Sequence, residues 1–182
     1  LVILSPVMLI TALAVIIDSP GPVFYRQRRV TRYGKIFRIH KFRSMVSDAS
    51  ARGGLLTLNN DGRITRVGRF IRHYRLDEFP QLLDILAGNM SFVGTRPEVE
   101  KYVEHYTDEM NATLLMPAGI TSRASILYRN EDRLLNEADD PDRVYIEKVM
   151  PDKMKYNLEM LRDFSLIGEL GILLDTVRTI LR

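Results

Sequence analysis

The first feature of the hydrophobic pattern is an N-terminal stretch that is almost continuously apolar. Residues 1–17 contain polar side chains only at Ser5 and Thr11. A helix of about 17 residues rises roughly 26 Å, which is marginal against a hydrocarbon core of roughly 30 Å. Pro6 lacks the backbone donor that a regular helix needs, so the pattern predicts a kink or break at Ser5 and Pro6.

Three interpretations of this segment compete. A signal peptide would end in a cleavage site, whereas Asp18-Ser19-Pro20-Gly21-Pro22 leads directly into a basic run. An ordinary transmembrane or buried core helix fits, and so does a broken, re-entrant helix that returns to the side it entered. The chain does not begin with Met, and we expect an earlier part of this segment to be missing. For the membrane alternatives, the following basic residues place residues 18–182 in the cytoplasm.

The pattern after the apolar segment changes to short extended stretches. Val23–Thr31 and Ile36–Met45 read as two strands joined by a turn at Arg32-Tyr33-Gly34-Lys35. Lys41 and Arg43 are two positions apart, so they are expected on one strand face, where they could bind one phosphate together. A charged strand face or a topology signal is the plainer explanation.

Helical periods dominate the rest of the chain. They predict a short helix over Pro80–Ala87, a longer one opening at Pro97-Glu98, and an amphipathic one over Phe164–Leu181. The last either packs against the fold or lies flat on a membrane surface. Asn130–Asp142 reads as an acidic loop. We therefore expect an α/β or α+β fold, mostly helical with a small β-sheet or hairpin.

Charge is concentrated around one pair of carboxylates. Asp77 and Glu78 follow arginines that recur at every third position, at Arg63, Arg66, Arg69, Arg72 and Arg75. Neighbouring arginines in such a series repel each other on a helix unless an anion lies between them. Acids beside fixed cations are typical of phosphate chemistry. The alternative is that Asp77 only caps a helix, Glu78 favours the helix N-terminus, and the arginines are solvated.

Composition narrows the choice of partner. The 182 residues suit a single domain with a sizeable core, and the formal net charge is +3. Between Arg26 and Arg43 lie eight basic residues and no acid, which favours an anionic partner. No nucleic-acid-binding motif is recognisable. The absence of cysteine excludes disulfides, thiolate metal sites and thiol nucleophiles.

Several motifs together resemble a known family. They are Ser5-Pro6, Asp18-Ser19-Pro20-Gly21-Pro22-Val23-Phe24-Tyr25-Arg26-Gln27, Lys41-Phe42-Arg43-Ser44-Met45, Leu76-Asp77-Glu78-Phe79-Pro80-Gln81-Leu82, Gly88-Asn89-Met90-Ser91-Phe92-Val93-Gly94 with Arg96-Pro97, and Gly119-Ile120-Thr121. This order resembles the bacterial sugar transferases, the monotopic polyprenyl-phosphate phosphoglycosyl transferases, either a small initiating member or the catalytic domain of a larger one. The resemblance covers Ser5 to Thr121 and is less distinctive beyond it.

The resemblance implies a reaction and a location. A sugar phosphate passes from a UDP-sugar to undecaprenyl phosphate and UMP is released, which initiates the synthesis of exopolysaccharide, O-antigen or glycoprotein. The reaction is expected at the cytoplasmic face of the bacterial inner membrane, with residues 1–17 as a re-entrant helix broken at Ser5 and Pro6. No nucleic acid is expected as a partner. The resemblance leaves open whether the protein forms a homodimer.

The resemblance also implies roles for individual residues. Asp77 is the nucleophile that forms a phosphosugar intermediate, and Glu78 is associated with Mg²⁺. Arg72 and Arg96 match family positions and are expected to bind substrate phosphate, with Lys41 and Arg43 as the next candidates.

Three departures from the family pattern leave the sugar open. Thr95 stands where proline is more usual, Ser122-Arg123-Ala124-Ser125 replaces Gly-Trp-Ala-Gln, and His73-Tyr74-Arg75 differ from the common residues before the dyad. The rival hypothesis is a non-catalytic, membrane-associated basic module that binds anionic lipid or nucleic acid.

Overall fold

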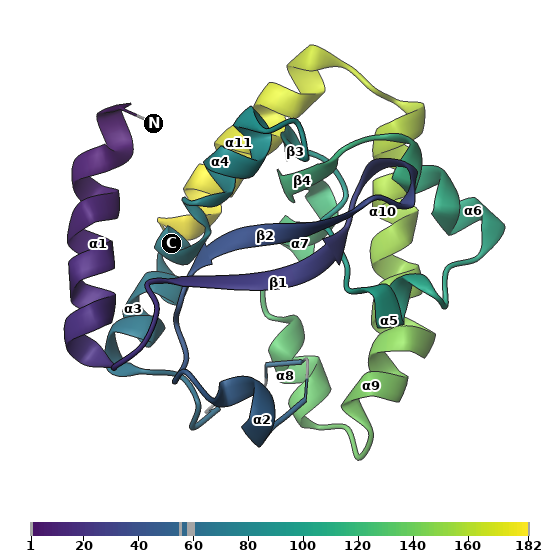
Figure 1. Cartoon of the computed structure of the whole chain (residues 1–182). Coiled ribbons are helices and arrows are strands. Elements are labelled where there is room, and N and C mark those ends of the chain that lie inside the picture. The colour runs from purple at the N-terminus through teal and green to yellow at the C-terminus, as the bar shows by residue number, and fades with distance from the viewer. Residues whose placement is uncertain (1, 55, 58–60, 182) are drawn as a thin grey trace.

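The computed structural model describes residues 2–54, 56–57 and 61–181, and it shows a mostly helical α+β fold, as predicted (Figure 1). The α-helices are α1 Ser5–Asp18, α2 Ala49–Arg52, α3 Arg66–His73, α4 Gln81–Leu86, α5 Glu100–Val103, α6 Asp108–Asn111, α7 Arg123–Leu127, α8 Glu131–Asn136, α9 Pro141–Val144, α10 Met150–Arg162 and α11 Leu166–Ile180. The strands are β1 Phe24–Val30, β2 Ile36–Phe42, β3 Met90–Val93 and β4 Ala118–Thr121. Short 3₁₀ turns are η1 Val2–Leu4, η2 Arg32–Gly34, η3 Leu76–Glu78 and η4 Ala112–Leu115, and η5 Tyr145–Val149 is a π-helix.

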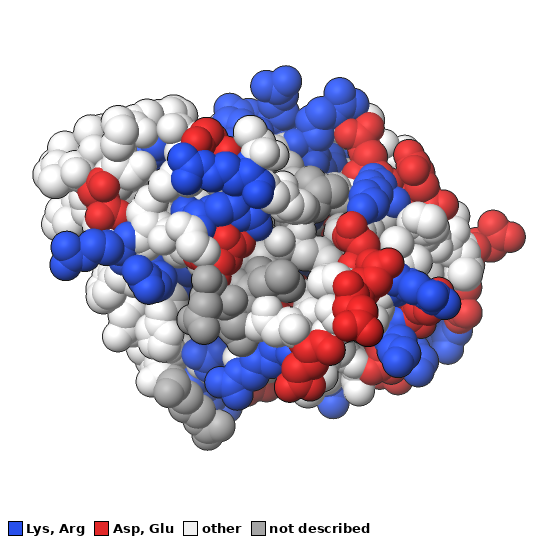
Figure 2. Space-filling model, turned by 90° about the horizontal axis from the view of Figure 1, so that it is seen from below, with Lys and Arg blue, Asp and Glu red and all other residues white. Residues whose placement is uncertain are grey.

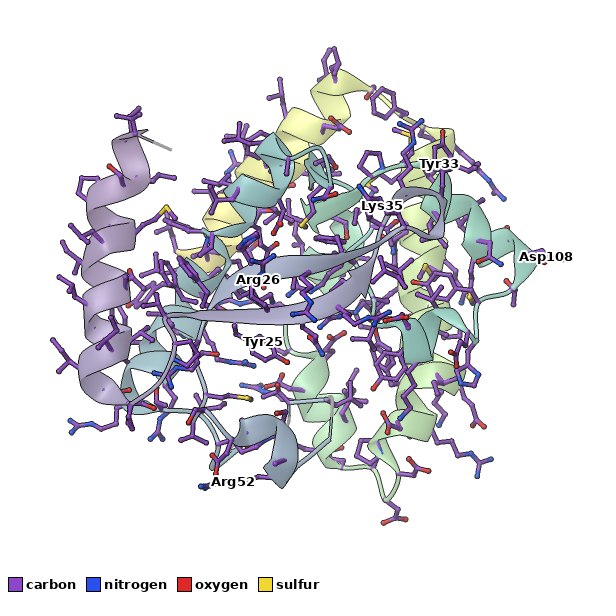
Figure 3. The ribbon with its side chains drawn as sticks, viewed as in Figure 1. Tyr25, Arg26, Tyr33, Lys35, Arg52 and Asp108 are labelled. Atoms are coloured by element: carbon purple, nitrogen blue, oxygen red, sulfur yellow. The ribbon has the colours of Figure 1, made fainter. Side chains whose placement is uncertain are left out.

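The strands form two small sheets. β1 and β2 make the predicted antiparallel hairpin, in register from Phe24 opposite Phe42 to Val30 opposite Ile36. At its turn, where Figure 3 labels Tyr33 and Lys35, Tyr33 adopts a φ of 58°. β3 and β4 are parallel. The ammonium of Lys35 donates to Asn89 Oδ1 at 3.2 Å, so the hairpin turn is joined to the segment that leads into β3.

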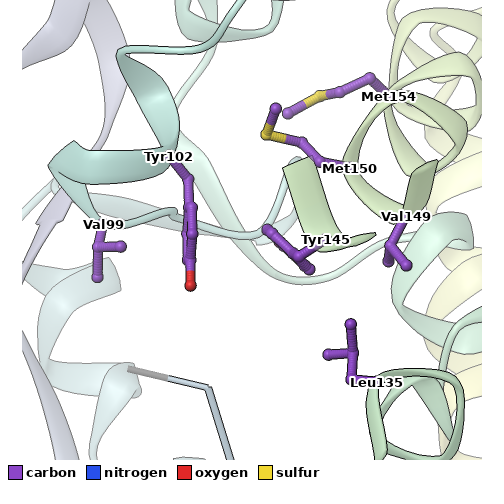
Figure 4. Close-up of a cluster of buried hydrophobic side chains, with 7 residues drawn as sticks. All are labelled: Val99, Tyr102, Leu135, Tyr145, Val149, Met150 and Met154. Atoms are coloured by element: carbon purple, nitrogen blue, oxygen red, sulfur yellow. The ribbon is translucent and has the colours of Figure 1, made fainter. Parts of the chain in front are cut away.

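A hydrophobic core lies between α5, α8, η5 and α10. Tyr102, Leu135, Tyr145 and Met150 are each at most 3% exposed, and the Tyr102 and Tyr145 rings lie 4.7 Å apart between centroids (Figure 4). This core fixes the segments that follow Pro97 against the C-terminal part of the chain.

Helix α1 packs on β2 and α3 through one face only. Val15 is buried with Phe42 of β2 and Ile71 of α3. The opposite face is apolar but open, with Ile10 67% and Ile17 84% exposed. The space-filling view accordingly shows a largely uncharged edge on the α1 side of the molecule (Figure 2).

The predicted break at Ser5 and Pro6 coincides with a change of helix type. The α-helix begins at Ser5 with Pro6 in its first turn, and Val2–Leu4 in front of it form a 3₁₀ turn. Proline is tolerated at that position because the first backbone N–H groups of a helix have no intrahelical acceptor. None of the helices in the described ranges has the length and apolar character needed to cross a bilayer. The re-entrant path stays a prediction.

Two segments differ from the sequence-based prediction. The helix expected after Pro97 is interrupted, because the Thr107 side chain accepts a hydrogen bond from Met110 N and starts a separate helix, α6. The acidic stretch Asn130–Asp142, expected as a loop, contains α8 and the start of α9. Asp140 caps α9 by accepting from Arg143 N, with Pro141 in the first turn.

Candidate active site

A sharp turn of the chain carries the two carboxylates into the protein. α3 ends at His73, and Arg75 adopts φ 56° and ψ 19°, a left-handed conformation that L side chains rarely take. The chain thereby reverses into η3, where Asp77 and Glu78 are each 6% exposed. The series of arginines is therefore not one helical spiral, since only Arg66, Arg69 and Arg72 lie on α3.

Glu78 is surrounded by cations from three segments, which are β2, the turn before η3 and the loop after β3. Its carboxylate accepts from Arg96 at 2.5 Å and 3.2 Å and from the Lys41 ammonium at 3.1 Å, and Arg75 lies 3.8 Å away. Burial opposes ionisation, but the charges of Arg96 and Lys41 outweigh it and hold the pKa of Glu78 well below its usual range. Glu78 is therefore an anion whose position is fixed on several sides.

Asp77, its neighbour, has the opposite environment. Its Oδ1 atom is buried without a hydrogen-bond partner, and no residue in the described ranges forms an ion pair with it. Burial and the adjacent Glu78 charge raise the pKa of Asp77, while Lys41, Arg72 and Arg75 act against that rise. Lys41, Arg72 and Arg75 are therefore the groups that favour its ionised form. It caps no helix, so the plainer interpretation of Asp77 is wrong.

The position of Arg96 depends on a close approach of two strand ends. Gly94 N donates to Thr121 O at 3.0 Å, and Gly119 N donates to Thr95 O at 2.9 Å. A Cβ atom on Gly119 would lie 2.1 Å from Gly94 N, which no side chain can satisfy without moving the backbone. The glycine pair therefore lets the chain turn directly after β3 and aim Arg96 at Glu78.

The dyad opens into a cleft of about 940 Å³. Lys41, Arg72 and Arg96 line it with Asp77 and Glu78, so the structure brings these predicted residues together. Arg72 forms no ion pair with the described residues. Arg43 is directed elsewhere, since its guanidinium donates to Ser19 O at 2.5 Å and Pro20 O at 2.6 Å. The expectation that Lys41 and Arg43 hold one phosphate together is therefore not met by these contacts.

Comparison with known proteins identifies the family of this chain. The family model for bacterial sugar transferases matches residues 1–182. The chain belongs to the bacterial sugar transferase family. It is 35% identical over 97% of its length to a UDP-N-acetylgalactosamine-undecaprenyl-phosphate N-acetylgalactosaminephosphotransferase of Aeromonas hydrophila, and 36% identical over 100% of its length to an undecaprenyl-phosphate galactose phosphotransferase of Salmonella typhimurium. The chain spans 40% and 38% of those two relatives.

A third relative matches a shorter part of the chain. A putative undecaprenyl-phosphate N-acetylgalactosaminyl 1-phosphate transferase of Bacillus subtilis is 40% identical over 60% of the chain, which spans 62% of that protein.

Several residues that line the cleft were not found from the sequence. Arg29 on β1 is half-buried, donates to Pro97 O at 3.0 Å and lies 3.7 Å from Glu98. Lys153 on α10 donates to Glu131 on α8 at 2.7 Å, and both line the cleft. The Arg29–Pro97 and Lys153–Glu131 contacts join residues 68 and 22 positions apart, so no local sequence pattern predicts them.

The Mg²⁺ expected for a bacterial sugar transferase can be tested against these donors. The described residues contain no cluster of three or more His, Cys, Asp or Glu that could hold a metal ion. Mg²⁺ is commonly bound by one or two carboxylates together with substrate phosphates and water. Among the described residues, Glu78 Oε2 accepts only the bond from Arg96 and Asp77 Oδ1 accepts none, so this pair fits that partial role.

Proposed function

We propose that this protein transfers a sugar phosphate from a UDP-sugar to polyprenyl phosphate, releasing UMP, through a covalent intermediate on Asp77. The observation that carries the proposal is the contrast within the dyad. One buried carboxylate is held by three cations, whereas its neighbour is unpaired and faces a cleft. The names of the relatives, which are undecaprenyl-phosphate sugar phosphotransferases, support the same reaction class.

In the first step an Asp77 oxygen attacks the phosphorus that carries the sugar. A P–O bond forms to the carboxylate, the bond to the uridine monophosphate oxygen breaks, and UMP leaves with that electron pair. Lys41, Arg72 and Arg75 supply positive charge at Asp77, which lets an anionic nucleophile approach an anionic donor. Mg²⁺, when bound at Glu78, would neutralise further charge on the diphosphate.

In the second step a phosphate oxygen of the polyprenyl acceptor attacks the same phosphorus. The new P–O bond forms as the bond to Asp77 breaks, and the carboxylate is regenerated as an anion. No proton has to move in either step, so the site needs no general base. Fixing Glu78 between Arg96 and Lys41 keeps the second carboxylate from competing as a nucleophile.

The exposed apolar faces of α1 and α11 are compatible with a protein that acts at a membrane surface. α1 exposes one apolar face, and α11 has no buried residue while Leu166 and Ile167 are 72% and 84% exposed. We propose a monotopic attachment on the cytoplasmic side of the bacterial inner membrane, with residues 1–17 entering the bilayer without crossing it. The membrane-bound acceptor would then reach the cleft without leaving the lipid.

UMP release from a panel of UDP-sugars tests the proposal. Asp77→Asn should abolish release while UDP-sugar binding, measured by calorimetry, stays partly intact. Asp108→Asn, on an exposed position of α6 (Figure 3), is the matched control and should turn over like the parent. Undiminished turnover by Asp77→Asn removes that residue from its role. If the parent releases no UMP and binds anionic lipid independently of Asp77, the protein is a non-catalytic membrane module.

A further inference from the structure

Helix α11 forms part of the wall of the catalytic cleft. Thr176, Thr179 and Ile180 line the cleft, and Thr176 shares a hydrogen bond of 2.8 Å with Thr121 at the end of β4. These three positions are three and four apart, so they form one stripe of the helix. α11 therefore lies between the cleft and the surroundings that its other faces contact.

An exposed apolar stripe runs along another face of α11 and adjoins the cleft-lining one where Val177 neighbours Ile180. Leu170, Leu174 and Val177 are 60%, 59% and 55% exposed, and they repeat at the same helical spacing. One helix thus carries an edge with two threonines that lines the cleft and an apolar edge toward the outside. A substrate that joins a charged head to a long apolar chain matches this arrangement, whereas a nucleotide sugar has no use for the apolar edge.

Arg129 marks the place where α11 meets the cleft. It follows α7, lines the cleft, and donates one hydrogen bond to the carbonyl oxygen of Thr179. No carboxylate of the described ranges lies within ion-pair distance of it, in contrast to Arg96 and Lys41, which are paired with Glu78. A guanidinium has five N–H donors, so most of those of Arg129 are available to an anion.

We propose that Arg129 binds the phosphate of the polyprenyl acceptor, with the first part of the lipid chain lying along Leu170, Leu174 and Val177 of α11. The inference rests on the proposed function and assigns the acceptor's charged end within the same cleft. The cations beside Asp77 would serve the donor's diphosphate, and Arg129 would hold the incoming phosphate at the lipid side. A planar guanidinium suits this task because it can donate two parallel bonds to phosphate oxygens.

A binding experiment tests this without any chemistry. A short-chain polyprenyl phosphate and the matching uncharged polyprenyl alcohol are titrated by calorimetry, in mild detergent, into the parent, Arg129→Gln and Arg123→Gln. Arg123 is an exposed arginine at the start of α7 that does not line the cleft, so it is the matched control. Arg129→Gln should bind the phosphate roughly 10- to 100-fold more weakly and the alcohol as the parent does. Unchanged phosphate binding, or equal loss for both lipids, overturns the proposal.

A kinetic experiment separates this inference from the proposed function. Without acceptor, Arg129→Gln should release one equivalent of UMP as fast as the parent, and with acceptor its KM for the polyprenyl phosphate should rise. If Arg129→Gln loses the UMP burst, the residue serves the donor or the fold and the inference is wrong. If the parent itself shows no burst, the proposed function fails, and the lipid titration still decides the role of Arg129.

Discussion

Replacing Glu78 by glutamine should strongly destabilise the fold, because it removes a buried anion that pairs with Arg96 and Lys41. Arg96 Nη2 lies 2.5 Å and Lys41 Nζ 3.1 Å from the same carboxylate oxygen, and the Glu78 side chain is only 8% exposed. Breaking a buried pair by removing one partner typically costs about 3–5 kcal/mol. We expect a value near the lower end, roughly 3 kcal/mol, because Lys41 can respond by losing its proton.

The expected loss is measured by urea unfolding followed by circular dichroism in mild detergent. Glu100→Gln is the matched control, since Glu100 also accepts two bonds from one arginine, Arg28, at 2.8 Å and 3.1 Å, but on the surface. An exposed pair is worth about 0–1 kcal/mol. Equal losses for the two variants would refute the account of Glu78 as a buried, charge-balancing group.

The difference in free energy of unfolding between the parent and Glu78→Gln should depend on pH in one direction. The folded protein holds the pKa of Glu78 well below its ordinary value of 4.5. Its charge therefore contributes stability that is complete above pH 4.5 and is lost as the pH falls through the folded-state pKa. The stability gap between the parent and Glu78→Gln should accordingly narrow on acidification. A gap that stays constant down to unfolding would contradict this linkage.

Three further outcomes follow from the same site. Burial lowers the pKa of Lys41 to about 8, so turnover should fall as the pH rises through 8. Lys41→Arg should remove that fall, and a pH–rate profile that is the same in both proteins contradicts the role of Lys41. Glu78→Gln should weaken the dependence of rate on Mg²⁺, and a metal titration identical to the parent's would show that Glu78 is not a ligand. A double variant, Leu170→Glu with Leu174→Glu on exposed positions of α11, should reduce sedimentation with vesicles containing anionic lipid, whereas retention like the parent's would exclude this face from membrane contact.

Local sequence signals predicted the elements that depend on local physics. The hairpin follows from two extended runs and the turn at Arg32–Lys35, and the helix after Pro80 ends before Gly88, which adopts a φ of 73°. The carboxylate pair was visible because Asp77 and Glu78 lie next to several arginines. Each of these signals is contained within a few residues of the chain.

The environment of the site could not be predicted, because distant segments create it. Glu78 receives Lys41 from 37 positions earlier and Arg96 from 18 positions later. The sequence gives no sign that Asp77 lacks a partner while Glu78 has several, although this difference separates their expected roles. Arg43 shows the converse error, since alternation along a strand placed it beside Lys41, whereas the strand ends at Phe42 and the guanidinium instead binds Ser19 and Pro20.

The covalent intermediate is the most direct test of the central claim that Asp77 is the attacking group. Intact-protein mass spectrometry after mixing with a UDP-sugar, without acceptor, should show an added sugar phosphate that peptide mapping places on Asp77 and that disappears when polyprenyl phosphate is added. Asp77→Asn should gain no mass. UMP release by the parent with no covalent adduct, or an adduct mapped to a different residue, would contradict the mechanism.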